Sequence, residues 1–287
     1  MLSKTLSASL LVAAASAAGG TPFNYVDIGD NWMAPDFPDA DCRNGREQSP
    51  VDLVKSTFST EAGNNKMKFE GYNYNDWPTG QVILKETHSL KMPISDPGTL
   101  RTQFPDQTTD SFTSAQLHFH APSEHSVNGE LLPLEMHIVH VHEDPTKFSV
   151  LGIFFVVGDE ENEYIKSLQF DKATEAGHPL TDVNLGTFLS GLDMSKFWHY
   201  DGSFTTPPCT EGVKWWVLEE PVTITQAQLD AFTAYNWGNA DYANGYGNNR
   251  RTQPLNDRTL YFRDSSEGSN AVALAVSSMA LALLALF

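Results

Sequence analysis

Three histidines have the spacing that a metal site built on two neighbouring strands requires. His118 and His120 are two residues apart, and His137 follows within Glu135-Met136-His137. Alternate residues of a β-strand point to the same face, so His118 and His120 can bind one ion side by side while a neighbouring strand supplies His137. Three neutral imidazoles leave one position of a tetrahedral zinc ion open, as a catalytic zinc requires. The spacing therefore predicts a catalytic zinc site.

Polar residues accompany the predicted ligands on the same strand faces. Gln116 and Glu135 each precede a predicted ligand by two residues. A metal-bound imidazole usually donates its second N–H to such an acceptor, and that bond fixes its tautomer and orientation. We therefore expect Gln116 and Glu135 to support the zinc ligands. The chain has nine histidines, and His140 and His142 repeat the same spacing, so spacing alone leaves a different trio open.

The elements that must position these residues are mainly strands. The uninterrupted apolar run 149–157 is typical of a strand buried on both faces. Further strands are predicted at 82–84, 134–141 and 214–218, a helix opening with the capping box Thr225 to Gln228, a second helix at 161–169 and coil at 236–249. These elements predict a large sheet with short peripheral helices.

The chain divides into one domain and two terminal segments. Residues 1–18 combine one lysine, a short apolar stretch and small residues, which predicts a cleaved secretory signal peptide rather than a core helix. Residues 265–287 begin with small residues and end in an uncharged apolar stretch, which predicts a signal for a lipid (GPI) anchor. A hydrophobic tail helix retained in the membrane is the alternative. Residues 19–264 remain as a single folded domain.

Charge and cysteine content restrict the partners and the compartment. The 36 acidic residues exceed the 18 basic ones and give a net charge of −18, which disfavours nucleic acid and anionic membranes as partners. Cys42 and Cys209 are the only cysteines. In an exported protein such a pair favours a disulfide over two free thiols. We therefore expect an extracellular or cell-surface protein, attached to the membrane, if at all, through its C-terminal anchor.

Five motifs in order along the chain resemble the α-type carbonic anhydrases, in particular their secreted, bacterial- and algal-like branch. They are Gln48-Ser49-Pro50-Val51-Asp52, Gln116 to His120 with Ser123-Glu124-His125, Leu134 to His140, Ser203 to Pro208 and Asn248 to Leu255. The resemblance covers nearly all of residues 19–264. It implies a mainly β, single-domain fold on a large, mostly antiparallel central sheet. The implied activity is zinc-dependent, reversible hydration of carbon dioxide to bicarbonate and a proton, by attack of zinc-bound hydroxide.

The resemblance also implies which residues carry the chemistry. Zinc would bind to His118, His120 and His137, and not to His140 or His142. The carbonyl of Asn248 would support His120, Thr205 would donate to Glu124 and orient the hydroxide, and His88 would shuttle protons. A histidine suits proton transfer because its ordinary pKa is near neutral pH.

The substrate pocket follows from the same resemblance. Its implied apolar wall consists of Val139, Val150, Phe204, Val213 and Trp215, with Thr206 beside the bicarbonate and Tyr25 ordering a water chain. Each apolar residue has an equally valid interpretation as ordinary core. The surroundings of His88 depart from the family pattern at Lys85, Glu86 and Lys91. Cys42 and Cys209 stand where extracellular members carry their disulfide.

Two other functions compete with a zinc lyase. A non-catalytic relative could serve as a binding, adhesion or mineral-associated module, and loss of a zinc histidine would favour that hypothesis. All three histidines are present here. Another kind of zinc hydrolase is the second rival, but the chain lacks a Ser/His/Asp signature.

Overall fold

The computed structural model describes residues 22–54, 66–70, 81–86, 88–94, 98–103, 108–234, 243, 245 and 247–264. The predicted signal peptide and the predicted C-terminal anchor lie outside these residues, as does most of the predicted coil at 236–249. Within the described part of the chain, no helix is both long and apolar enough to cross a membrane.

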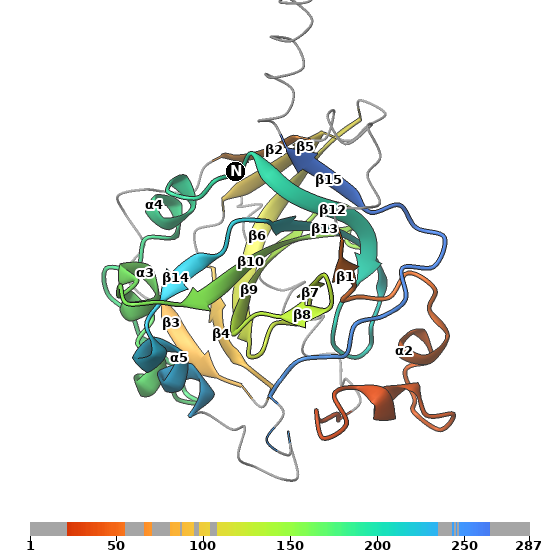
Figure 1. The fold of residues 1–287 in the computed structure, drawn as a ribbon, viewed down its shortest axis with the longest axis horizontal. Helices are drawn as coiled ribbons and strands as arrows, with labels where there is room; N and C mark the ends of the chain where they lie inside the picture. Colours follow the sequence, from red (N-terminus) through yellow and green to blue (C-terminus); the bar gives the residue numbers. More distant parts are fainter. Residues whose placement is uncertain are drawn as a thin grey trace, which may run out of the picture.

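One large sheet of twelve strands organises the molecule (Figure 1). Its main path runs β11 (His178–Pro179), β3 (Val82–Lys85), β4 (Leu90–Pro93), β6 (Thr109–His120), β9 (Leu134–Val141), β10 (Phe148–Val157), β13 (Glu211–Leu218), β12 (Lys196–Ser203), β15 (Tyr261–Asp264). Off this path, β14 (Val222–Ile224) pairs with β10, and β5 (Thr99–Gln103) pairs with β2 (Lys66–Glu70) and β6. Only β10–β13 and β10–β14 are parallel among the described pairs of this sheet. The predicted mainly β, mostly antiparallel fold is confirmed.

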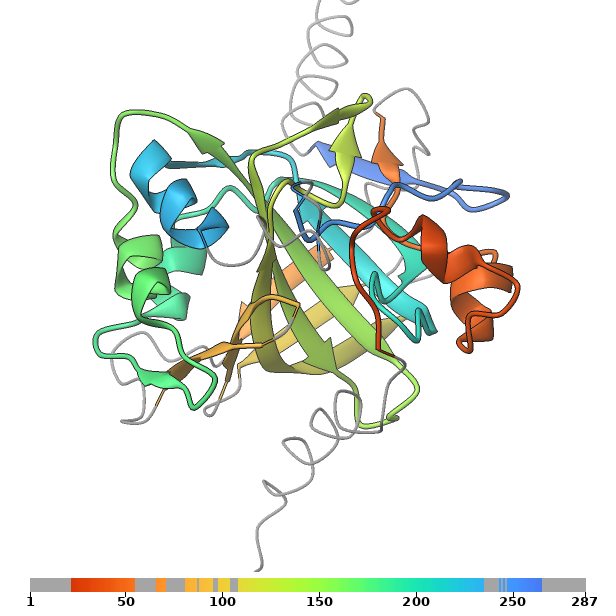
Figure 2. The same ribbon diagram turned by 90° about the horizontal axis from the view of Figure 1, so that it is seen from below.

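The remaining elements are short. A small second sheet combines β1 (Asp52–Leu53), β7 (Ser126–Val127) and β8 (Glu130–Leu131). The helices are η1 (Asp30–Met33), α2 (Ala40–Asn44), α3 (Glu163–Ser167), η4 (Phe170–Lys172), α4 (Leu185–Ser190) and α5 (Gln226–Thr233). Helices α3, α4 and α5 lie together at one side of the sheet, with α2 at the opposite side (Figures 1 and 2).

Local sequence signals account for where the helices begin and end. The predicted capping box forms at α5, since the Thr225 side chain accepts from the Gln228 amide and the Gln228 side chain accepts from the Thr225 amide. Helix α3 is shorter than the predicted 161–169. Asn162 caps it by accepting from Ile165 N, and Gln169 has a left-handed φ of 47°, which a helix cannot continue.

The two faces of the sheet carry separate apolar clusters because strand residues alternate between them. On β9, Met136 and Ile138 belong to the larger cluster. Val139, with Val150 and Trp215 of the neighbouring strands, belongs to the smaller one. The odd-numbered face of β9, which also carries the predicted ligand, therefore has its own apolar packing.

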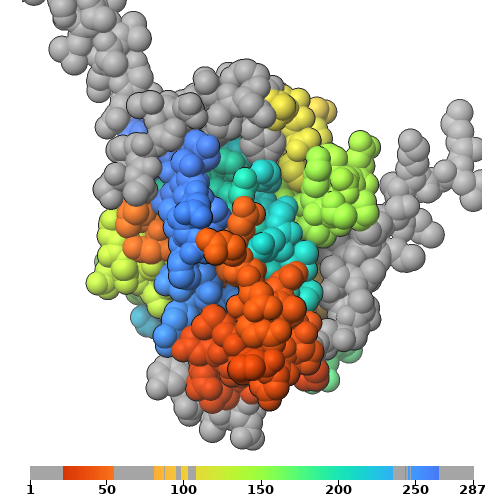
Figure 3. Space-filling view, turned by 90° about the vertical axis from the view of Figure 1, so that its right-hand side faces the viewer, coloured from red at the N-terminus to blue at the C-terminus, as the bar shows by residue number. Residues whose placement is uncertain are grey.

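Residues 22–54, the first described segment, lie beside residues 247–264, the last described segment, on one surface of the molecule (Figure 3). Arg251 N donates to Ile28 O, and Gln253 N donates to Pro50 O. A disulfide between Cys42 and Cys209, with Cα atoms 4.9 Å apart, joins α2 to the loop that follows β12. The predicted disulfide is confirmed.

Candidate metal centre

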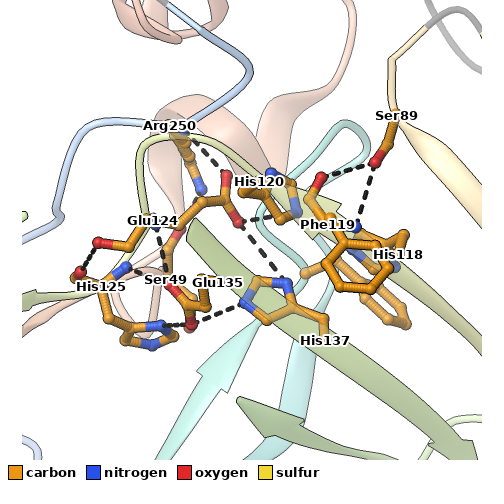
Figure 4. Close-up of polar contacts among 12 residues, drawn as sticks. Ser49, Ser89, His118, Phe119, His120, Glu124, His125, Glu135, His137 and Arg250 are labelled. Carbon is orange, nitrogen blue, oxygen red and sulfur yellow. Dashed lines mark hydrogen bonds and ion pairs between the residues drawn. The ribbon is translucent and has the colours of Figure 1, made fainter. Parts of the chain in front are cut away.

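The three predicted ligands meet on one face of the sheet. His118 and His137 are direct cross-strand partners between β6 and β9, and His120 lies opposite Glu135. Ligand nitrogens of His118, His120 and His137 all lie within 4.8 Å of one another. Figure 4 shows His120 and His137 each joined by a dashed line to Glu124. Since His140 has the opposite parity on β9, it lies on the other face and does not join them.

Each ring has a hydrogen-bond acceptor that fixes its tautomer. His118 Nδ1 lies 2.9 Å from Gln116 Oε1, and His120 Nδ1 lies 2.7 Å from the backbone oxygen of Asn248. A carbonyl oxygen only accepts, so both Nδ1 atoms carry the hydrogen and both Nε2 atoms keep a lone pair. His137 is turned the other way. Its Nε2 donates to Glu135 Oε1 at 2.8 Å and leaves the lone pair on Nδ1.

The unused nitrogens fit a metal ion. His120 Nε2 is buried without a hydrogen-bond partner among the described residues, and a buried polar atom of this kind normally has one. Burial lowers the pKa of His120 to about 3 and also lowers the pKa of His118 and His137, so all three rings are neutral. Neutral imidazole is the form that ligates zinc. The donor set therefore fits a tri-histidine zinc site.

Glu135 holds the His137 ring in place by accepting its hydrogen bond. Its Oε1 accepts from His137 Nε2 and, at 2.7 Å, from His125 Nδ1, while Oε2 accepts from the amides of Glu124 and His125 at 2.9 Å each. Burial alone would raise the pKa of Glu135, but His125 and His137 more than offset this and hold the pKa well below its ordinary value. Glu135, His125 and His137 also form a group with metal-ligand spacing. Their donors are already paired with one another, so the open site is the tri-histidine one.

A second buried carboxylate borders the site. Glu124 Oε1 accepts from Arg250 N at 2.9 Å, and Oε2 lies 3.4 Å from His120 Nε2 (Figure 4). Burial raises the pKa of Glu124 well above its ordinary value, and the Thr205 side chain and the Arg250 amide oppose that rise by hydrogen bonding. Thr205 is itself buried. The structure thus brings Glu124 and Thr205 together beside the histidines.

The predicted pocket residues lie on the same side of the sheet as His137. Val139, Val150, Val213 and Trp215 belong to the smaller apolar cluster, and Phe204 packs against it. The Trp215 ring lies edge-on to His137 with centroids 4.8 Å apart. Thr206 is half-buried in the loop after β12 and accepts from Cys209 N.

His88 packs against Phe23, near the start of the described chain. Its ring stacks on Phe23 with centroids 3.7 Å apart, and its Nε2 donates to Phe23 O at 3.1 Å. Burial lowers the pKa of His88, while the Phe23 carbonyl and the charge of Glu86 act in the opposite direction. Tyr25 is fully buried next to Phe23, with ring centroids 5.7 Å apart. Phe23 is a neighbour that the sequence did not reveal.

Other supporting residues were also missed from the sequence. The Tyr200 hydroxyl lies 2.7 Å from His125 Nε2 and donates to Ser49 Oγ at 2.9 Å. Arg250 is fully buried and donates to Gln48 Oε1 and Ser49 O. Ser49 and Arg250 do stand within two of the five motifs, which was the available signal for their importance.

The architecture and the site define a class: a β-sheet protein with a group of three histidines on one sheet face that could hold a metal ion. Comparison with known proteins narrows the class. Residues 29–264 match the family described as eukaryotic-type carbonic anhydrase. The carbonic anhydrase of Klebsiella pneumoniae is 31% identical over 236 residues, covering 80% of this chain and 86% of the relative.

Solved structures agree with the sequence comparison. An α-carbonic anhydrase from Thermovibrio ammonificans in complex with sulfanilamide is 30% identical, with a TM-score of 0.61, over 78% of this chain and 90% of that one. A halotolerant carbonic anhydrase from Dunaliella salina is 27% identical, with a TM-score of 0.67, over 85% of this chain and 98% of that one. The chain belongs to the eukaryotic-type, or α-type, carbonic anhydrase family of enzymes.

Proposed function

We propose that the protein hydrates carbon dioxide reversibly at a zinc ion held by His118, His120 and His137. The supporting observation is that the buried Nε2 of His120 makes no hydrogen bond within the described residues and lies beside two more unprotonated ring nitrogens. When bound, zinc supplies a Lewis acid that lowers the pKa of a water molecule to about 7, a value established for carbonic anhydrases themselves. The apolar cluster around Val139 and Trp215 offers carbon dioxide a dry surface next to the histidines.

The supporting residues set the orientation of the three rings. Gln116, the Asn248 carbonyl and Glu135 each hold one N–H, so each ring presents its lone pair to the same point. In this proposal the Thr205 hydroxyl donates to Glu124, which would fix where the hydroxyl oxygen of Thr205 points. Thr205 can then orient the reacting oxygen by accepting a hydrogen bond, which is a positional contribution to the rate.

The proton released in hydration must leave the pocket. His88 donates from Nε2 to Phe23 O, so Nδ1 is the nitrogen that can take up a further proton. The ordinary pKa of a histidine lies near neutral pH and suits this transfer, and burial lowers the pKa of His88 from that value. Thr206, Phe204 and Tyr25 complete the proposed pocket.

The disulfide fits an exported protein, and we propose that residues 1–18 direct export and residues 265–287 provide the anchor.

The deciding experiment is stopped-flow hydration of carbon dioxide beside a zinc assay. His118→Asn should lose both bound zinc and fast hydration, because two histidines remain where three are needed. His178→Asn, on the edge strand β11, is the matched control and should retain both. A zinc-loaded, folded parent without hydration would instead favour the binding-module hypothesis.

Anchoring needs its own test on cells. A phosphatidylinositol-specific phospholipase should release the protein from the cell surface if a lipid anchor replaces the C-terminal segment. Retention after treatment would contradict the lipid anchor.

A further inference from the structure

Lys91 stands in the same cross-strand row as two proposed zinc ligands. On β4 it is the direct partner of His118, which is in turn the partner of His137. Directly opposite residues present their side chains on the same sheet face, so the Lys91 side chain projects from the face that carries the metal centre. Burial lowers the pKa of His118 most, and the neighbouring charges that lower it further include Lys91.

Glu86, at the start of the β3–β4 turn, forms an ion pair with the ammonium group of Lys91. Lys91 Nζ donates to Glu86 Oε1 at 3.0 Å, with side-chain exposures of 12% for Lys91 and 43% for Glu86. The charge of Glu86 also acts on His88. One member of the ion pair, Glu86, therefore acts on the proposed shuttle His88, and the other, Lys91, acts on His118. An ammonium group carries more N–H donors than one carboxylate oxygen uses, so Lys91 can bind a second acceptor.

We propose that Lys91 binds small anions, including bicarbonate, in the pocket beside the metal centre, and that Glu86 limits this affinity by neutralising part of its charge. This inference rests on the proposed function, since bicarbonate is the anion formed there. Carbon dioxide is neutral and gains little from a cation on the pocket wall. A largely buried ammonium group attracts anions more strongly than an exposed one, because water screens it less.

Thiocyanate binding to the cobalt-substituted enzyme, followed by visible absorption, measures anion affinity without turnover. Lys91→Gln should weaken binding and Glu86→Gln should strengthen it, each by roughly two- to fivefold, the size expected for a partly exposed charge interaction. The double variant should behave as Lys91→Gln, because Glu86 acts through Lys91. The KM for bicarbonate in the dehydration direction should rise in Lys91→Gln by a similar factor.

Lys85→Gln is the matched control. It removes the same charge from the same hairpin, but Leu84 is the residue opposite Lys91, so Lys85 lies on the other sheet face. Thiocyanate affinity should therefore be unchanged in Lys85→Gln. An equal loss in Lys85→Gln and Lys91→Gln, or no loss in Lys91→Gln, would overturn the proposal. Stopped-flow hydration by the parent separately tests the proposed function, so the two failures are distinguishable.

Discussion

A Cβ atom on Gly152 would lie 3.0 Å from Glu135 Oε1, the oxygen that accepts from both His125 and His137. Gly152 is the cross-strand partner of His137 on β10. The same Cβ would lie 3.3 Å from both methyl carbons of Val217. A methyl group fits there only if Glu135 or Val217 moves, since neither contact is an ordinary van der Waals distance. The absent side chain at 152 therefore leaves the space that Glu135 needs to hold His137.

Gly152→Ala should consequently impair zinc retention. Displacing Glu135 weakens its hydrogen bond to His137, and loss of such a supporting bond typically lowers metal affinity by about tenfold or more. The zinc dissociation rate in the presence of a chelator measures the effect. Gly191→Ala is the control, because a Cβ there would meet Phe188 O at an ordinary 3.5 Å. Equal zinc loss from both variants would contradict the role assigned to Gly152.

The sequence predicted what depends on local periodicity. Parity on two strands placed His118 with His120 and opposed His137 to His140, and the long apolar run of β10 identified a buried central strand. Periodicity says which face a residue takes, but not which distant segment covers it. Arg250 reaching Gln48 across 202 positions is a contact of that kind. Family resemblance supplied part of what periodicity could not.

The Asn248 side chain holds the carbonyl that supports His120. Its Oδ1 accepts from Ala121 N at 2.8 Å, and its Nδ2 donates to Phe119 O at 2.9 Å and to His88 O at 3.0 Å. Asn248→Asp keeps the shape but turns a donor into an acceptor facing two carbonyl oxygens.

We therefore expect Asn248→Asp to lower the free energy of unfolding by about 1–3 kcal/mol, the cost of leaving buried polar groups unpaired. Urea denaturation measures the change. Asn256→Asp offers a control, since Asn256 is exposed and donates only to Arg46 O among the contacts described. An unfolding midpoint for Asn248→Asp no lower than that of the control would refute the assignment.

The disulfide should contribute strongly to stability because it closes a long loop. Cys42 and Cys209 are 167 positions apart. In the chain-entropy model such a closure stabilises the folded state by roughly 5 kcal/mol, which is an upper limit for Cys42→Ser combined with Cys209→Ser. Urea denaturation of the double variant and the oxidised parent measures the loss. Adding a reductant should lower the midpoint of the parent but not that of the variant, and equal midpoints without reductant would contradict this expectation.

His140 should make stability depend on pH. Burial lowers its pKa to about 4, against an ordinary value of 6.5. As the pH falls below 6.5, His140 binds a proton in the unfolded chain but not yet in the folded chain. The contribution of His140 to the free energy of unfolding is therefore complete above pH 6.5 and declines toward pH 4. The expected loss of unfolding free energy at pH 5 is about 2 kcal/mol.

Urea unfolding of the parent and of His140→Gln, each at about pH 7.5 and about pH 5, isolates the contribution of His140, because the contributions of all other groups cancel when the two proteins are compared. The advantage of the parent over His140→Gln should shrink on acidification, whereas its advantage over His178→Gln, on edge strand β11, should change less. A parent-to-variant difference that is equal at both pH values would show that the folded chain protonates His140 as readily as the unfolded one.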